Sequence, residues 1–88
     1  MTFTSVRNYY ESLVFKEVLE QLDDSSDDLK SDIACVALNH LPPRYIRHEV
    51  DMFFYLSPQE REETTEKVRK AVTEAIEFMN LAESNRRK

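Results

Sequence analysis

The chain of 88 residues has no glycine, no tryptophan and only one cysteine. Without glycine, a glycine-rich phosphate loop is excluded, and any turn that requires a positive φ must use asparagine or aspartate. The lone Cys35 excludes an intramolecular disulfide and a cysteine metal cluster, and its place in a helical pattern predicts a core or near-core residue. No apolar run approaches the roughly 20 residues that span a bilayer, and no signal-peptide stretch opens the chain. We therefore expect a cytoplasmic protein made of helices joined by short polar links.

Positive charge is also scarce, and it is unevenly placed. Residues 8–43 carry two lysines against eight acidic residues, a net charge of −6 within a chain whose formal charge is −5. Two compact basic spots stand out, one at 44–47 with His40 and His48 close by, the other at the tail 86–88. Nucleic acid as the main partner is disfavoured, because it needs a broad positive face. A small anion held by a few arginines fits this charge pattern.

The length predicts one mainly α domain over residues 1–88, with 1–7 as a lead-in and 84–88 as a frayed tail. A first helix follows Asn8, which can cap it while Glu11 reaches back, as in a capping box. Its apolar arc is broad enough to suggest burial on two sides, one in the core and one against a partner. The arc comprises Tyr10, Leu13, Val14, Phe15, Val18, Leu19 and Leu22.

Two further helices are indicated by local signals. After a solvated acidic linker at 23–28, a second helix over 29–41 must end at Pro42 and Pro43. The linker lacks the central glycine and distal glutamate of a calcium loop. Ser57, Pro58 and Glu60 mark the start of a last helix that runs to about Ala82. We expect its first two turns to project into solvent and its later turns to bury Val68, Val72, Ala75, Ile76, Met79 and Ala82.

Residues 44–56 fit two structures. A period of two predicts an extended segment, best over the first half, while a helical spacing is also present. A lone strand leaves its backbone groups unpaired. Its simplest partner would be the same strand of a second subunit, paired antiparallel about a two-fold axis.

The group Arg44-Tyr45-x-Arg47 is the best candidate for chemistry. Arginine forks bind phosphate and read the guanine edge, and tyrosine stacks on a base. The alternative is structural, with Tyr45 packed on the core and both arginines paired with Glu49 or Asp51. No catalytic set assembles, so we expect no enzyme activity, no metal and no cofactor. His40 and His48 make a weak metal pair, and His40 can instead donate to free helix carbonyls.

Two blocks between residues 8 and 55 carry a family resemblance. Asn8-Tyr9-x-Glu11 and Asp32-Ile33-x-x-x-Ala37-Leu38-Asn39-x-Leu41-Pro42-Pro43-x-Tyr45 resemble the ComFB family of late competence proteins. The resemblance implies a mostly helical homodimer. It also implies, for the cyanobacterial members, a receptor for cyclic dinucleotides, chiefly cyclic di-GMP, linked to cell size, motility or competence. Zinc-binding cysteines of other members are replaced here by Asp27, Asp28 and Lys30, so no zinc site is expected.

Together these features predict a receptor for cyclic di-GMP, with cyclic di-AMP as the other ligand considered, that signals through a homodimer to an unidentified regulatory protein. Arg44 and Arg47 would grip the ligand, and Tyr45 or an N-terminal tyrosine would stack on a base. Arg7 is a further candidate because it lies beside the first helix N-terminus. The full candidate set is Arg7, Tyr9, Tyr10, Asn39, Arg44, Tyr45 and Arg47. The alternative is a scaffold module without a ligand, with the apolar first helix as its interaction surface. A DNA-associated competence factor is disfavoured by the acidic balance.

Overall fold

The computed structural model describes residues 3–86, and within them all side chains except those of Glu49, Phe53 and 81–86. The described chain is mainly helical, as the sequence predicts. Its elements are β1 (Arg7–Asn8), α1 (Tyr10–Gln21), α2 (Asp27–Asn39), β2 (Tyr45–Ile46), α3 (Glu49–Tyr55) and α4 (Pro58–Arg86). No helix among the described residues is long and apolar enough to cross a membrane.

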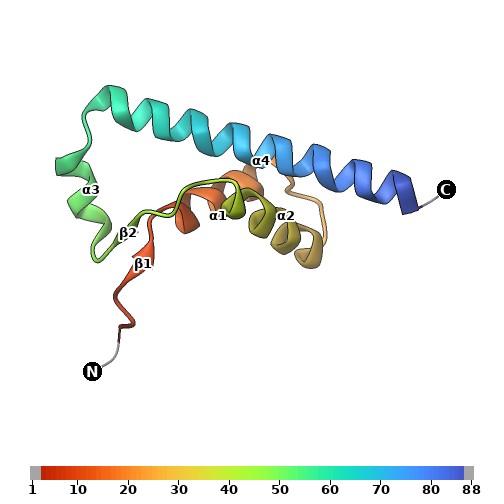
Figure 1. Cartoon of the computed structure of the whole chain (residues 1–88), viewed down its shortest axis with the longest axis horizontal. Coiled ribbons are helices and arrows are strands. Elements are labelled where there is room, and N and C mark those ends of the chain that lie inside the picture. The colour runs from red at the N-terminus through yellow and green to blue at the C-terminus, as the bar shows by residue number, and fades with distance from the viewer. Residues whose placement is uncertain (1–2, 87–88) are drawn as a thin grey trace.

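Helices α1, α2 and α4 pack against one another and form the body of the domain. Figure 1 shows α4 lying along the whole molecule, with α1 and α2 side by side beneath its middle. The two strands and α3 gather at the end of the molecule where α4 begins (Figure 1). Helix α4 therefore serves two regions, because its central turns cover α1 and α2 while its first turn follows directly on α3.

The core lies between these three helices. Ile33, Val14 and Val72 are its largest fully buried side chains, and Tyr10 and Leu41 belong to the same cluster at 6% exposure each. The prediction for α4 is confirmed where it is described, with Val68, Val72 and Ala75 buried and Ile76 and Met79 half-buried. The side chain of Ala82 lies outside the described residues.

Helix α1 buries only one side of its broad apolar arc. Val14 and Val18 are buried, whereas Phe15 and Leu19 remain 48% and 55% exposed. The second side expected from the sequence is therefore open in this chain. Cys35 is likewise exposed, which corrects the expectation of a core or near-core cysteine, because it faces away from the α2 stripe of Ile33, Ala34 and Ala37.

Side-chain caps set the starts of α2 and α4. The Ser57 hydroxyl accepts from the Glu60 N–H at 3.2 Å, and the Glu60 carboxylate accepts from the Ser57 N–H at 3.3 Å, which confirms the predicted capping box. The Ser26 hydroxyl accepts from the Leu29 N–H at 3.2 Å. Helix α2 therefore begins at Asp27, two residues earlier than predicted, so the end of the acidic linker forms its first turn.

The helix ends also differ from expectation. Helix α4 continues to Arg86, so residues 84–86 of the predicted frayed tail are helical, and 87–88 lie outside the described residues. No described residue has a positive φ, so no turn in the described chain requires asparagine or aspartate for that reason. Helix α2 instead ends through His40 at φ −97° and ψ 0°, a conformation that any residue can adopt.

The ambiguous segment 44–56 contains both structures. Tyr45–Ile46 is a strand and Glu49–Tyr55 is a short helix. The strand pairs antiparallel with β1 of the same chain, so it is not a lone strand, and its pairing with a second subunit stays a prediction. The entry of the chain into α1 lays Arg7–Asn8 beside β2, which satisfies backbone groups that a lone strand would leave unpaired.

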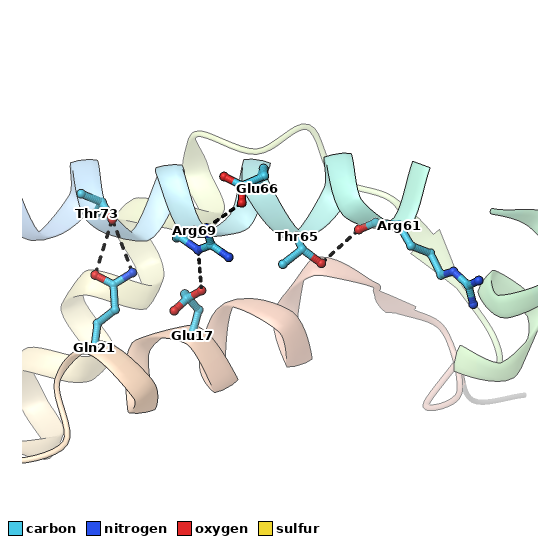
Figure 2. Close-up of polar contacts among 7 residues, drawn as sticks. All are labelled: Glu17, Gln21, Arg61, Thr65, Glu66, Arg69 and Thr73. Atoms are coloured by element: carbon cyan, nitrogen blue, oxygen red, sulfur yellow. Dashed lines mark hydrogen bonds and ion pairs between the residues drawn. The ribbon is translucent and has the colours of Figure 1, made fainter. Parts of the chain in front are cut away.

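Polar contacts join α1 and α4 beside the core. The Gln21 amide of α1 donates to the Thr73 hydroxyl at 3.4 Å, and the Arg69 guanidinium of α4 lies 2.6 Å from Glu66 and 3.9 Å from Glu17. Figure 2 shows Arg69 between these two carboxylates. Except for Glu17, whose side chain is 14% exposed, these side chains are open to solvent, and each pair adds little free energy. The apolar core is therefore the main source of stability.

Replacing a fully buried residue should reveal this dependence. We expect Ile33→Ala to lower the free energy of unfolding by about 2–5 kcal/mol, because it leaves a cavity where three helices meet. Leu19→Ala, a matched change at a 55% exposed position, should cost less than about 1 kcal/mol. Urea denaturation followed by circular dichroism measures both values. Equal losses in the two variants would contradict the described core.

Candidate functional site

The pairing of β1 with β2 brings most of the predicted site residues together. Arg7 lies opposite Ile46 and Asn8 lies opposite Tyr45. Arg7, Arg44, Tyr45 and Arg47 therefore lie on or directly beside one two-stranded ladder, and all four side chains are exposed. We call these four residues the arginine ladder. The sequence placed Arg7 and Arg44 in one candidate set, and only the strand pairing makes them neighbours.

The arginine ladder presents its side chains on two faces. Directly opposite residues of an antiparallel pair share a face, and successive residues of a strand alternate. Arg7 therefore shares a face with Ile46, and Arg44, two residues before Ile46, is on the same face. Tyr45 and Arg47 are on the other face. Arg44 lines a shallow cleft of about 160 Å³, together with Tyr10, Leu56 and residues of the first turns of α4. Its face is thus turned towards α4, and the Tyr45 ring, 69% exposed, is turned to solvent.

Asn8 holds the ladder against the first helix. Its side-chain oxygen accepts from the Tyr10 N–H at 3.2 Å and from the Arg44 N–H at 3.0 Å. The Tyr9 N–H donates to the Arg44 carbonyl at 2.7 Å. Both backbone groups of Arg44 are therefore bound to the junction of β1 and α1, which fixes the arginine relative to the start of that helix.

This role of Asn8 goes beyond the predicted cap. Its side chain does serve the first N–H of α1, but Tyr9 occupies the N-cap position, and no hydrogen bond from Glu11 completes a capping box in the described chain. The contact with Arg44 spans 36 residues of sequence, so no local pattern could reveal it. The only sequence signal was the presence of Asn8 in the Asn-Tyr-x-Glu block.

The remaining candidates differ in accessibility. Tyr10 is 6% exposed and belongs to the core, with its ring centroid 6.2 Å from that of Tyr9, which is half-buried. Tyr45 therefore offers the most open ring of the predicted tyrosines. Asn39 is the exposed last residue of α2, and no hydrogen bond joins it to the arginine ladder in the described chain.

The ladder arginines form no ion pair among the described side chains, although Glu60 and Glu63 also line the cleft beside Arg44. None of Arg7, Arg44 and Arg47 forms an ion pair there, including with Asp51, and the Glu49 side chain lies outside the described residues. Tyr45 does not pack on the core, which corrects the structural alternative for that residue. Three arginines thus lie on or directly beside one short ladder, Arg7 and Arg44 on one face and Arg47 on the other, in a chain of net charge −5. Arginine side chains are suited to bind an anion.

The two histidines lie outside this group. The His40 Nδ1 donates to the Val36 carbonyl at 2.9 Å, as expected for a side chain that serves free carbonyls at a helix end. Within the described residues, no cluster of three or more His, Cys, Asp or Glu side chains could hold a metal ion.

Comparison with known protein families gives a match. Residues 7–82 match the model of a family described as late competence development protein ComFB. The matched region begins at Arg7 of β1 and includes the whole arginine ladder and the three core helices up to residue 82. No curated protein matches the chain.

Removing the Asn8 acceptor should loosen the ladder. We expect Asn8→Ala to lower the free energy of unfolding by about 1–2 kcal/mol, since two backbone donors lose one shared acceptor. The melting temperature should fall by about 4–8 °C for each kcal/mol in a chain of this size. Asn39→Ala is the matched control, and its exposed position predicts a change within about 0.5 kcal/mol. Thermal melts of both variants by circular dichroism decide the matter, and equal shifts would argue against the Asn8 contacts.

Proposed function

The chain belongs to the ComFB family of late competence development proteins, and on this premise we propose that it is a non-enzymatic receptor for a cyclic dinucleotide, cyclic di-GMP first. The observation that carries the proposal is the arginine ladder. It gathers three arginines without ionic partners among the described side chains, and one exposed tyrosine, on an otherwise acidic chain.

The chemistry of the ladder suits such a ligand. Arginine forks bind phosphate oxygens through two parallel hydrogen bonds, and they also match the O6/N7 edge of guanine. An exposed tyrosine ring gives a base a stacking surface. We assign phosphate contacts to Arg7 and Arg44, and base contacts to Tyr45 and Arg47. The long arginine side chains of both faces can reach one ligand across the free edge of β2.

The proposal includes a homodimer. The described sheet has two strands, so β2 keeps one edge without a strand neighbour. Because both backbone groups of Arg44 face β1, alternation directs those of Tyr45 to this outer edge. Helix α3 follows β2 and exposes Val50 and Tyr55 at 61% and 75%. A second copy covering this region would add apolar burial that an 88-residue chain has in short supply.

Signalling to a regulatory protein then requires that the ligand favour one of two states. A ligand shifts a conformational equilibrium only by its difference in affinity for the two states. The backbone of Arg44 is tied to the start of α1, so a ligand that moves Arg44 would act on that helix.

The alternative function is a scaffold module in competence or motility regulation that binds no small molecule. One observation favours it, namely that α1 exposes Phe15 and Leu19 as an apolar surface. In that case the ladder would serve only to join the N-terminal segment to β2.

Calorimetry separates the two functions. At a protein concentration of about 50 μM, where a micromolar Kd is visible, we expect heat with cyclic di-GMP, and cyclic di-AMP and GTP test the choice of ligand. Arg44→Ala and Arg47→Ala should each weaken binding by about 1–3 kcal/mol, because a charged hydrogen bond to phosphate or base is lost. Lys16→Ala, which removes an exposed cation from α1, is the control and should bind normally.

Two results would count against this proposal. The absence of heat with all three ligands would leave the scaffold function. Normal affinity in both arginine variants would place any ligand site away from the ladder.

The dimer is tested by sedimentation. We expect a concentration-dependent dimer at micromolar protein, and we expect Tyr55→Ser to shift it towards monomer because apolar contact area at α3 is lost. Phe78→Ser is the control, since Phe78 is a comparably exposed aromatic residue on α4. A single monomeric species for the unmodified chain would exclude the dimer.

A further inference from the structure

Helices α1 and α2 leave an open apolar groove on their surface. The groove measures about 470 Å³, with Phe15 and Leu19 on the α1 side and Ala34, Cys35 and Leu38 on the α2 side. We call it the α1–α2 groove. It shares no lining residue with the arginine ladder or with the cleft beside Arg44.

Its α1 wall consists of large apolar side chains that the described chain leaves open to solvent. Phe15 and Leu19 are 48% and 55% exposed, and their spacing of one helical turn puts them side by side. Two such side chains on one helix gain free energy only when another molecule covers them. A groove between two packed helices accepts the side-chain ridge of a third helix in the same way as the helices accept each other.

The two helices that form the groove expose many acidic side chains. Helices α1 and α2 and the link between them carry seven exposed acidic side chains: Glu11, Glu20, Asp23, Asp24, Asp27, Asp28 and Asp32. None of the seven forms an ion pair among the described residues, and Asp27 lines the groove itself. Lys30, a basic residue of the lining, directs its ammonium to the Asp23 carbonyl at 3.2 Å. The exposed surface of these two helices therefore attracts cations.

We propose that the α1–α2 groove binds an amphipathic helix of another protein, with large apolar side chains on one face and lysine or arginine along its flanks. A second copy of this chain suits the groove poorly, because a two-fold contact would set the same acidic side chains against each other. The inference deepens the proposed signalling function by naming the surface and the chemistry of the protein partner. The inference rests on the proposed function for the role of the partner in signalling. Binding of the helix to the groove itself requires no cyclic dinucleotide.

The single cysteine makes occupancy of the groove measurable. Cys35 is exposed and lines the groove, and the chain has no other cysteine. The probe is a helical peptide of leucine and lysine, with leucine at positions i, i+3, i+4 and i+7 and lysine elsewhere. At a peptide concentration about ten times the Kd, we expect alkylation of Cys35 to slow by about tenfold, since only the unoccupied fraction reacts.

Variants inside and outside the groove test where the peptide binds. Phe15→Ser and Leu19→Ser should each weaken binding by about tenfold, because each removes apolar area that the peptide would bury. Phe78→Ser changes an aromatic side chain of similar exposure outside the groove and should bind normally. Circular dichroism of each variant checks that the helices are retained. A leucine–glutamate peptide of the same pattern should leave the alkylation rate unchanged.

Each other outcome overturns the proposal. The groove would be removed as the binding site if the leucine–lysine peptide did not slow alkylation. The same follows if the Phe15 and Leu19 variants bound the peptide as tightly as the unmodified chain. Equal protection by the acidic peptide would refute the basic partner. Self-association of the unmodified chain that Leu19→Ser abolishes would make a second copy the occupant. Calorimetry with cyclic di-GMP is independent of all these results, so failure of either proposal can be recognised separately.

Discussion

Burial of small side chains of α4 between α1 and α2 is the constraint on which the rest of the structure depends. Ala71, Val72 and Ala75 bring the long helix close to its neighbours, and Ile33 and Val14 fill the space between them. Because α4 is anchored by its central turns, its first turns extend past the core to the region where α3 and the two strands lie (Figure 1). The position of the candidate site is therefore a consequence of the core.

The second level of organisation is the joint between the N-terminal segment and β2. A single carboxamide oxygen on Asn8 accepts from both Tyr10 and Arg44, so the start of α1 and the start of β2 are held at one point. This joint brings three of the twelve Lys and Arg residues of an acidic chain to one short ladder. The N-terminal segment contributes one arginine to the ladder, and the segment around β2 contributes two. Arginine side chains pair with phosphate and carboxylate groups by geometry as well as by charge.

Helix α1 is the element common to both surfaces. Its first residue is tied to the arginine ladder, and its exposed middle forms one wall of the α1–α2 groove. The two surfaces differ in chemistry. The arginine ladder is basic and has an exposed tyrosine, whereas the α1–α2 groove is apolar and lies between two acidic helices. They could be coupled only if a ligand at one of them changed the equilibrium position of α1, which is a thermodynamic condition and not a matter of proximity.

The sequence by itself determined the features that depend on neighbouring residues. The capping box at Ser57 and Glu60 and the buried stripe of Val68, Val72 and Ala75 follow from contacts within a few residues, so pattern alone predicts them. Only the tertiary structure decided which strand pairs with Tyr45–Ile46, that Tyr10 is buried while Tyr45 is open, and that Cys35 lies in a surface groove. These outcomes depend on contacts between segments that are tens of residues apart in the sequence. Such contacts form only when α1, α2 and α4 pack into one core, and no local pattern specifies that packing.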